Sequence, residues 1–353
     1  MARTKVSAPT LLDRARREGN PVLEGETATF VWQGRTAPRL LCDLFEWEEN
    51  PQALVHTGPA TWSLTLNLPR DAYLEYAFLD PKTGAWLPDA LNPRRVANGV
   101  GGRNHYFYMP EAGPSMLARR RPEVPRGSLT RHRIGTDGML IRATRGVSLY
   151  HPPVRGPVPL LVVFDGDDYL RRAQLPAMID NLIARRSIRP LALALLQNGG
   201  SGGRNAEYAC SDTTLAFLVN SVLPLARAEL NLVDLKRNPG AFGVLGASLG
   251  GLMAVYTALR LPHLFGRALS QSGAFQLDGL ETVVPTLVRT LPRPEVRIWM
   301  DVGRFESLLG CNRKLHDLLL EKRYQVAYRE YSGAHNYTSW RDDLGWGLEK
   351  LFC

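Results

Sequence analysis

A single serine set among glycines is the feature of the sequence best suited to chemistry. The run Gly246-Ala247-Ser248-Leu249-Gly250 follows an apolar stretch, 241–245, and precedes an apolar stretch with helical spacing, 252–259. This is the G-x-S-x-G pattern of a nucleophilic serine on a sharp strand-to-helix turn. Side chains larger than glycine at the flanking positions would collide with the neighbouring strand and helix. We therefore interpret Ser248 as a nucleophile; the alternative is a glycine-rich loop that contains a serine.

A serine hydroxyl is a weak nucleophile and needs a base, which an acid orients; in α/β-hydrolases the order along the chain is Ser, Asp or Glu, His. His335 lies directly after the last expected strand and before the last expected helix, where that base belongs. His263 falls in a surface turn and His316 in a helix, positions typical of structural histidines. Asp301, at a strand end, and Glu306, on the loop beyond it, are candidates for the acid. We favour Glu306 because a loop carboxylate can reach the imidazole.

Two backbone N–H groups are needed to hold the oxyanion that forms during attack by the serine. The first donor is expected at Leu249, directly after the nucleophile. The second is expected at Asp167, in the turn "VVFDGDDYL", where Gly166 lets the backbone approach a substrate closely. The carboxylates of Asp165, Asp167 and Asp168 could instead bind a cation, but no EF-hand spacing follows them. We predict no metal site and no cofactor.

Composition limits the classes of function. The chain has 353 residues, long enough for two domains, and is 44% hydrophobic, yet no run of 18 apolar residues predicts a membrane span. Four scattered cysteines without a CxxC pair, and an N-terminus that does not resemble a secretory signal, favour a reducing cytoplasm. The net charge of +9 suits an anionic small molecule, although solubility alone could explain it. No nucleic-acid-binding motif is present. The oligomeric state is not indicated.

Two halves of the chain differ in periodicity. Short alternating segments, 27–34, 61–69, 72–80 and 104–111, predict a β-sandwich after a short helix at 9–18. A Pro- and Arg-rich stretch without periodicity follows. We predict a β-sandwich domain at 1–112, a linker at 113–125 and an α/β domain at 126–353.

The second half alternates strand and helix patterns, which predicts a three-layer α/β domain with a mostly parallel sheet. In such sheets, sites lie at the carboxyl ends of the strands, and Ser248 is at such an end. A strand hairpin is expected first, at 128–135 and 139–153. The expected strands after it are 158–166, 189–198, 241–248, 266–274, 295–303 and 325–333, and the expected helices are 173–188, 213–230, 250–262, 311–324 and 340–352.

The segments "GASLGGLMAVYTALRLPHLFGRALSQSGAF", "FDGDDY" and "SGAHNYTSWRDDL" resemble the enterochelin (ferric enterobactin) esterase branch of the esterase-D-type α/β-hydrolases. "FVWQG", "WSLTLNLP", "YLEYAFLD" and "LPDALNPRR" are similar to the immunoglobulin-like domain that precedes the hydrolase there, so the resemblance covers about residues 28–353. It implies a cytoplasmic serine esterase that opens the ester bonds of a catecholate siderophore and so releases iron. It maps the nucleophile onto Ser248, the acid onto Glu306 and the base onto His335.

The same resemblance implies an Arg-x-x-Glu segment at Arg204 and Glu207. Arg204 is expected to hold an anionic substrate or, as we favour slightly, to pair with Glu207 as a scaffold. The chain departs from the family where Ala274 and Phe275 replace a tryptophan pair and where Tyr169 replaces a tryptophan that could contact substrate.

These departures do not affect the predicted ester hydrolysis, but they leave the identity of the substrate undetermined. The alternatives are a carboxylesterase, feruloyl-type esterase or acyltransferase acting on another ester. A non-catalytic protein that binds a siderophore or glycan is the alternative from a different class.

Overall fold

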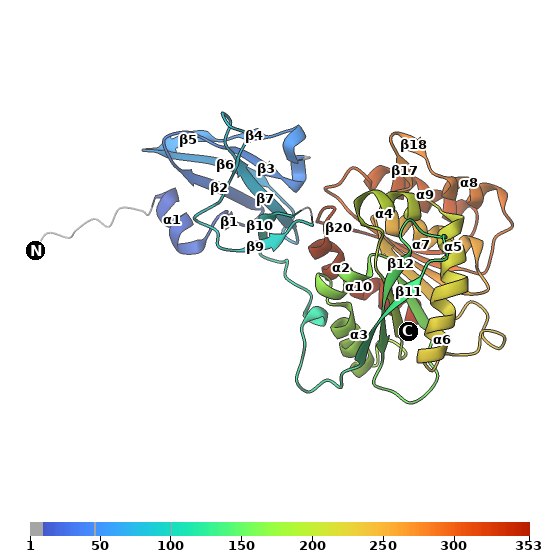
Figure 1. The fold of residues 1–353 in the computed structure, drawn as a ribbon. Helices are drawn as coiled ribbons and strands as arrows, with labels where there is room; N and C mark the ends of the chain where they lie inside the picture. The colour runs from blue at the N-terminus through green and yellow to red at the C-terminus, as the bar shows by residue number, and fades with distance from the viewer. Residues whose placement is uncertain (1–9, 46, 100) are drawn as a thin grey trace, which may run out of the picture. The chain divides into compact units, whose positions relative to one another are not determined.

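The chain folds into two compact units (Figure 1). The computed structural model describes residues 10–45, 47–99 and 101–353. The first unit runs to Gly113 and also includes Arg304–Glu306 and Ser332–Ala334; the second holds the remaining residues. Of the helix expected at 9–18, the described part is α1 (Leu11–Glu18), which begins at a capping box between Thr10 and Asp13.

The first unit is a β-sandwich, as the alternating segments predicted. One sheet has the order β1-β2-β6-β5 and the other β4-β3-β7-β10-β9, with β8 added to β7; the pairing is antiparallel throughout. Aromatic side chains fill the space between the sheets, with Phe30 packed edge-on against Tyr76 and Phe107. The strands are β1 (Val22–Glu24), β2 (Thr27–Gln33), β3 (Arg39–Cys42), β4 (Gln52–Ala53), β5 (Val55–Gly58), β6 (Thr61–Asn67), β7 (Tyr73–Leu79), β8 (Trp86–Leu87), β9 (Arg95–Ala97) and β10 (Arg103–Tyr108).

The second unit is built on an eight-stranded sheet of order β11-β12-β14-β13-β15-β16-β19-β20. The first three strands pair antiparallel and the rest are parallel, because each crosses over through a helix. The strands are β11 (Ser128–Gly135), β12 (Thr144–His151), β13 (Leu160–Val163), β14 (Ala192–Leu196), β15 (Phe242–Ala247), β16 (Phe265–Gln271), β19 (Arg297–Gly303) and β20 (Gln325–Tyr331), beside a small hairpin of β17 (Gln276–Leu277) and β18 (Leu280–Glu281).

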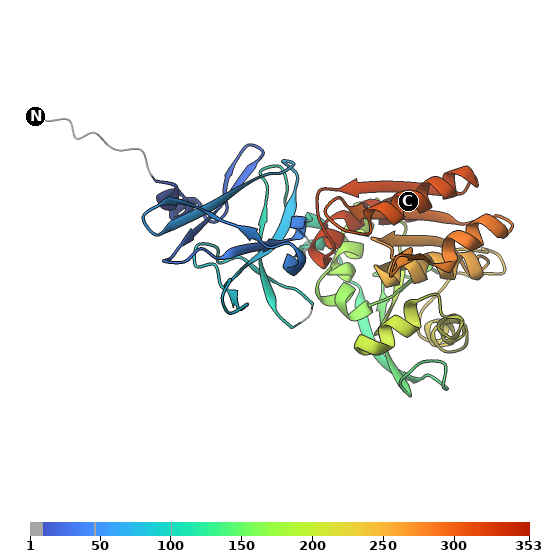
Figure 2. The same cartoon turned by 90° about the horizontal axis from the view of Figure 1, so that it is seen from above.

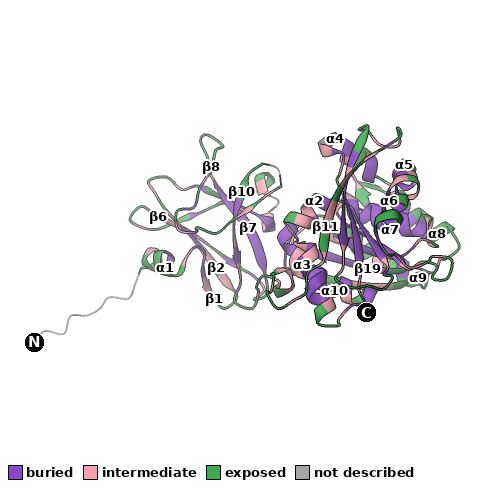
Figure 3. Cartoon of the chain, turned by 60° about the horizontal axis from the view of Figure 1, so that its bottom comes forward, coloured by how far each residue is buried: buried purple, intermediate pink, exposed green. Residues whose placement is uncertain are grey.

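Helices cover both faces of this sheet, so the unit has the three layers that the alternation predicted (Figure 2). Side chains of α2, α3 and α10 form one core with the sheet, and those of α5 to α9 form the other; both cores enclose buried strands (Figure 3). The helices are α2 (Gly166–Arg171), α3 (Leu175–Ala184), α4 (Gly200–Tyr208), α5 (Asp212–Phe217), α6 (Leu223–Glu229), α7 (Leu249–Arg260), α8 (Val283–Thr290), α9 (Leu309–Glu321) and α10 (Tyr337–Phe352). A π turn, Leu218–Val222, joins α5 to α6, so the single helix expected there has a bulge.

The segment expected to be a linker, 113–125, forms hydrogen bonds with helices of the second unit. The side-chain amide of Asn181 on α3 donates to the carbonyl oxygens of Leu117 and Arg119, at 2.7 and 2.9 Å. The backbone N–H of Ser115 donates to the Asp342 carboxylate of α10 at 2.8 Å. These contacts join residues more than 60 positions apart in sequence, so local composition could not reveal them.

Within the described ranges, no single helix is long and apolar enough to cross a membrane, and one pair of segments meets that test only when joined across an 85° bend.

Candidate active site

Ser248 occupies a strained turn between β15 and α7. Its φ of +60° and ψ of −123° are rare for a residue with a side chain and cost on the order of 1–3 kcal/mol. Neighbouring backbone holds the residue in place, since its N–H donates to the Gln271 carbonyl at 2.9 Å and its carbonyl accepts from the Ala274 N–H at 3.1 Å. The serine is half-buried at the carboxyl end of a parallel strand. This is the geometry of a nucleophile elbow.

The glycines around Ser248 are required by close packing. A Cβ on Gly246 would lie 2.3 Å from backbone atoms of Gly250, and a Cβ on Gly251 would lie 2.7 Å from the Ser270 hydroxyl oxygen. A Cβ on Gly250 would come within 3.3 Å of an Asp165 carboxylate oxygen. The predicted collision of larger side chains with the neighbouring strand and helix is therefore confirmed.

A buried ion pair ties the elbow to the neighbouring strand. The Arg204 guanidinium donates from Nε to both carboxylate oxygens of Asp165, at 2.8 and 3.0 Å, and from Nη2 to Oδ2 at 2.7 Å. The same Nη2 donates to the carbonyl of Ala247, directly before the serine, at 3.3 Å. Burial alone would lower the pKa of Arg204, but the contacts with Asp165 outweigh it and raise the pKa. Arg204 thus links the ends of β13 and β15.

The predicted pairing of Arg204 with Glu207 is wrong. Glu207 forms its ion pair with Arg145, and both side chains are almost fully buried. One turn of α4 separates the two residues of the Arg-x-x-Glu segment. Arg204 pairs with Asp165, which follows β13, and Glu207 pairs with Arg145 near the start of β12. The partner of Arg204 is Asp165, and the choice between a scaffold role, which we favour, and a role in substrate binding stays a prediction.

Tyr169 and Gly166 are not exposed to a substrate, which corrects their predicted role. The Tyr169 side chain is fully buried and its hydroxyl donates to Gln271 Oε1 at 3.0 Å. Burial raises the pKa of Tyr169 well above its ordinary value. A Cβ on Gly166 would lie 2.4 Å from the Leu195 carbonyl carbon, so this glycine allows α2 to pack against β14. Both residues therefore support the packing of the elements around Ser248.

The two expected oxyanion donors lie in first turns of helices. Leu249 is the first residue of α7 and Asp167 the second residue of α2. N–H groups at these positions have no acceptor within their own helix. The N–H groups of Asp168 and Tyr169 are already used, because both donate to the Asp165 carbonyl. Leu249 and Asp167 remain the predicted donors.

Of the two candidate acids, Asp301 is fully buried, and its carboxylate accepts several hydrogen bonds. Its carboxylate accepts from Trp299 Nε1 at 2.7 Å and from the Gln271 side-chain amide at 3.2 and 3.3 Å. Glu306 is half-buried and lies three residues beyond the end of β19. The environment of Asp301 is that of a structural carboxylate, which favours Glu306 as the acid.

His335 lies on the loop between β20 and α10 and is exposed, with its ring edge-to-face against Trp340. The loops that carry Glu306 and His335 follow adjacent parallel strands, with Gly303 opposite Tyr331 in the register. A hydrogen bond of 3.0 Å from the Phe305 N–H to the Gly333 carbonyl joins the two loops. The assignment of Ser248, Glu306 and His335 as a triad stays a prediction.

The acidic run after β13 is neutralised by arginines. Asp165 pairs with Arg204, Asp167 with Arg171 and Asp168 with Arg172. In the part of the chain that the structure describes, no group of three or more His, Cys, Asp or Glu side chains is arranged to hold a metal. The sequence suggested only one role for these three carboxylates, that of metal ligands, and did not indicate the structural role of Asp165. Nor did it indicate the role of Gln271, whose amide bridges Tyr169 and Asp301; no local signal distinguishes that glutamine.

Comparisons with known proteins agree with this geometry. Residues 140–351, more than half of the chain, match the Esterase family, described as "Putative esterase". The chain belongs to this family. Within it the chain is of the enterochelin esterase-like type, a group of carboxylic ester hydrolases.

The iron(III) salmochelin esterase of Escherichia coli O6:H1 is 27% identical over 92% of this chain and 87% of its own length. The iron(III) enterobactin esterase of Dickeya dadantii is 28% identical over 53% of this chain, which spans about half (46%) of that relative. The crystal structure of the Shigella flexneri enterobactin esterase, determined in the presence of enterobactin, covers 92% of both chains with a TM-score of 0.74 at 21% identity. That structural likeness establishes the shared fold: an α/β-hydrolase unit with a β-rich N-terminal domain.

Proposed function

We propose that the chain is a cytoplasmic serine esterase that hydrolyses the ester bonds of an anionic catecholate siderophore, such as ferric enterobactin, so that iron can be released. The observation that carries the proposal is the strained elbow of Ser248 at the carboxyl end of β15 in a chain of the Esterase family. The relatives named for enterobactin and salmochelin give the substrate class. The net charge of +9 would attract an anionic ester.

In the proposed mechanism, His335 takes the proton from the Ser248 hydroxyl while the serine oxygen bonds to the ester carbonyl carbon. Glu306 fixes the imidazole tautomer and stabilises the imidazolium. The N–H groups of Leu249 and Asp167 hold the oxyanion; loss of one such donor costs on the order of a hundredfold in rate or more. The imidazolium returns its proton to the departing alcohol and leaves an acyl-serine. A water, deprotonated by His335, then releases the acid and restores the serine.

The decisive experiment compares wild type with Ser248→Ala on ferric enterobactin and on p-nitrophenyl butyrate, with products identified by mass spectrometry. The exposed Ser128, at the start of β11, supplies a matched Ser→Ala control. We expect wild type and the control to open the tri-lactone and Ser248→Ala to lose at least a thousandfold. A fluorophosphonate should label Ser248 in the same preparations. Equal turnover by Ser248→Ala would overturn the serine mechanism.

A carboxylesterase acting on another ester, such as a feruloyl-type ester, is the second candidate, and one observation favours it. Ala274 and Phe275, which replace the tryptophan pair, are 3% and 1% exposed, and Tyr169 is fully buried. None of these three residues offers an aromatic surface for a catechol ring to stack on. Cleavage of the simple ester without cleavage of the tri-lactone would select this candidate. If neither ester is cleaved and ferric enterobactin still binds, the chain is a binding protein instead.

A further inference from the structure

A cavity lies at the amino ends of the parallel strands of the large sheet, whereas the elbow lies at their carboxyl ends. The volume of the cavity is about 800 Å³, which is in the range of small-molecule sites. It opens where the parallel strands begin: Ala241 lines it directly before β15, whereas Ser248 follows the other end of that strand. A strand of this length spans roughly 20 Å, so the cavity is distinct from the proposed esterase site.

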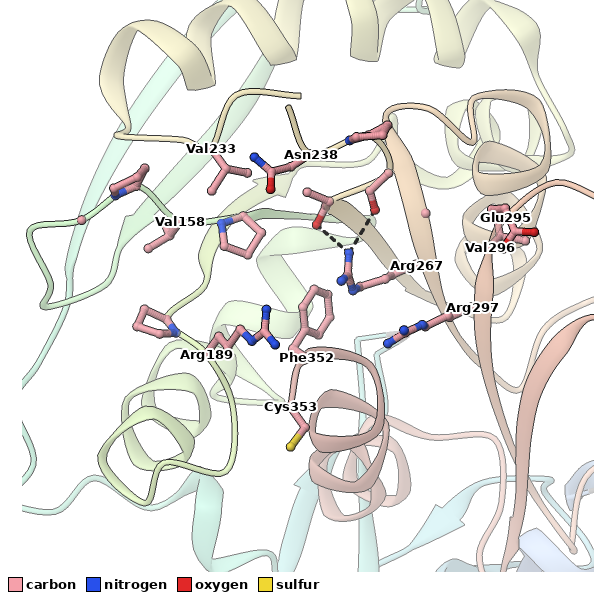
Figure 4. Close-up of a pocket in the computed structure, with 18 of the residues that line it drawn as sticks. Val158, Arg189, Val233, Asn238, Arg267, Glu295, Val296, Arg297, Phe352 and Cys353 are labelled. Carbon is pink, nitrogen blue, oxygen red and sulfur yellow. Dashed lines mark hydrogen bonds between the residues drawn. The ribbon is translucent and has the colours of Figure 1, made fainter. Parts of the chain in front are cut away.

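Three arginine side chains converge on this cavity from different elements (Figure 4). Arg267 and Arg297 stand opposite each other on β16 and β19, and Arg189 comes from the segment before β14. Like charges directly opposite each other across strands are destabilising. Among the described residues, none of the three forms an ion pair with a carboxylate. The cluster therefore carries positive charge that the described part of the protein does not neutralise.

Arg267 is the fixed member of the cluster. It is half-buried and donates from Nε to the Leu351 carbonyl at 2.9 Å and from Nη1 to the carbonyls of Gly240 and Ala241, both at 3.0 Å. A guanidinium has five N–H donors, so these bonds leave the two on Nη2 for a ligand. Burial, and then the charges of Arg297 and Arg189, lower the pKa of Arg267, as expected for a cation without a nearby anion.

An apolar wall accompanies the charges. The ring of Phe352 lies beneath Arg267, with Cζ of the arginine 5.6 Å from the ring centroid. Gly243 makes room for this ring, because a Cβ there would lie 2.7 Å from Phe352 Cζ. Val158 and Val296 extend the wall. One acidic side chain, that of Glu295, also lines the cavity, but it is 81% exposed and pairs with Arg293.

We propose that this cavity is a second ligand site that binds a small organic anion, with a carboxylate, phosphate or sulfonate group on an apolar body. The guanidinium groups of Arg189, Arg267 and Arg297 bind the anionic group, with planar forks that match its oxygens. The ring of Phe352 and the valines contact the apolar body. The site does not depend on the proposed esterase chemistry, since it shares no residue with the elbow.

The test uses two fluorescent probes of one shape, the anion 8-anilinonaphthalene-1-sulfonate and its uncharged parent N-phenyl-1-naphthylamine. Both are titrated into wild type and into the Arg189→Gln/Arg297→Gln protein; Arg267 is kept because its backbone hydrogen bonds support the fold. Arg131→Gln is the matched control, since Arg131 is an exposed strand arginine on β11 outside the cavity. Unchanged hydrolysis of p-nitrophenyl butyrate, if wild type cleaves it, and an unchanged melting temperature verify that the variants are folded.

We expect one saturable site for the anion in wild type and in Arg131→Gln, binding at least tenfold weaker for the uncharged probe, and a loss of about tenfold per arginine removed. Displacement of the probe by phenylpropionate or phenyl phosphate, tested separately, would show which anionic group the site prefers. The proposal is overturned if the anion does not bind or if both probes bind equally. It is also overturned if the double variant binds like wild type, or if fluorophosphonate labelling of Ser248 abolishes probe binding.

Discussion

Replacing Arg204 with glutamine tests whether the ion pair with Asp165 holds the elbow in place. The Asp165 carboxylate is 1% exposed, and in this variant it loses the three hydrogen bonds that it accepts from the Arg204 guanidinium. Breaking a buried ion pair costs about 3–5 kcal/mol. Because the Arg204 side chain is 24% exposed, and because Asn198 Nδ2 still donates to Asp165 at 2.6 Å, we expect a smaller loss, about 2–3 kcal/mol of unfolding free energy.

The effect on catalysis follows from the contact between Arg204 and the Ala247 carbonyl. Without this contact, Ala247, which directly precedes Ser248, is held less firmly, and a misplacement of a reacting group by about 1 Å can cost on the order of a hundredfold in rate. We expect kcat to fall by about ten- to a hundredfold for p-nitrophenyl butyrate. KM should change less than threefold, since a scaffold arginine makes no substrate contact.

The assay combines urea unfolding with steady-state kinetics on a neutral ester and on an anionic one. Arg171→Gln is the matched control: that arginine also pairs with an aspartate of α2, but it is 73% exposed, so its loss should cost less than about 0.5 kcal/mol. In a double-mutant cycle with Asp165→Asn, the coupling energy should exceed about 1 kcal/mol. Unchanged stability, with KM raised only for the anionic ester, would refute the scaffold role and assign Arg204 to substrate binding.

Three further predictions follow from packing and burial. Gly246→Ala should destabilise the protein by about 1–3 kcal/mol or more and lower kcat at least a hundredfold, because the new Cβ would lie 2.3 Å from backbone; unfolding and kinetics near wild type would contradict the tight elbow. Tyr169→Phe should cost about 1 kcal/mol of unfolding free energy and leave KM within twofold, since the hydroxyl only bonds Gln271; a large KM increase would restore its predicted substrate role. Asp43 is buried beside Glu75, and burial, then that charge, raise its pKa well above the ordinary value. The folded protein therefore favours the protonated Asp43 carboxyl. The stability that this preference contributes is fully present below the ordinary pKa of aspartate, and it is lost as the pH rises through the higher pKa of Asp43 in the folded protein. The melting temperature of Asp43→Asn relative to wild type should accordingly increase from pH 4 to pH 8, and a difference that stays constant would contradict this assignment.

The elements of the large sheet could be predicted because each carries a local signal. Strands such as β13 and β15 are continuous apolar runs, which parallel strands buried on both faces require. The turn at Ser248 was predictable for the same reason, since its glycines lie within six consecutive residues and are required by local steric limits. The short helices α2, α4 and α8 were not predicted as helices: they have six to nine residues, too few to establish a periodicity.

The partners of charged and polar side chains could not be predicted, because tertiary packing decides them. Arg204 lies three residues from Glu207 and 39 from Asp165, yet it pairs with the distant residue. Proximity in a helix favours the i,i+3 pair by only a few tenths of a kcal/mol, which a bidentate contact with a buried carboxylate outweighs. The burial of Tyr169 could not be predicted either. An aromatic residue next to a predicted site can pack in the core or contact a substrate, and the sequence does not distinguish the two.

The distribution of positive charge bears on how a substrate would be attracted. A net charge of +9 suggests steering of anions to the ester site, but charge acts through its position, and screening limits its reach to roughly 10 Å. Arg204, Arg171 and Arg172 near the elbow are paired with aspartates, so they add little net field there. The arginines of the cluster, Arg189, Arg267 and Arg297, form no ion pair with a carboxylate in the described part of the chain. They lie at the amino ends of the strands, opposite the end where Ser248 lies. Anions would therefore concentrate at that cluster independently of the esterase reaction, so salt should weaken binding there more than it slows hydrolysis of a neutral ester.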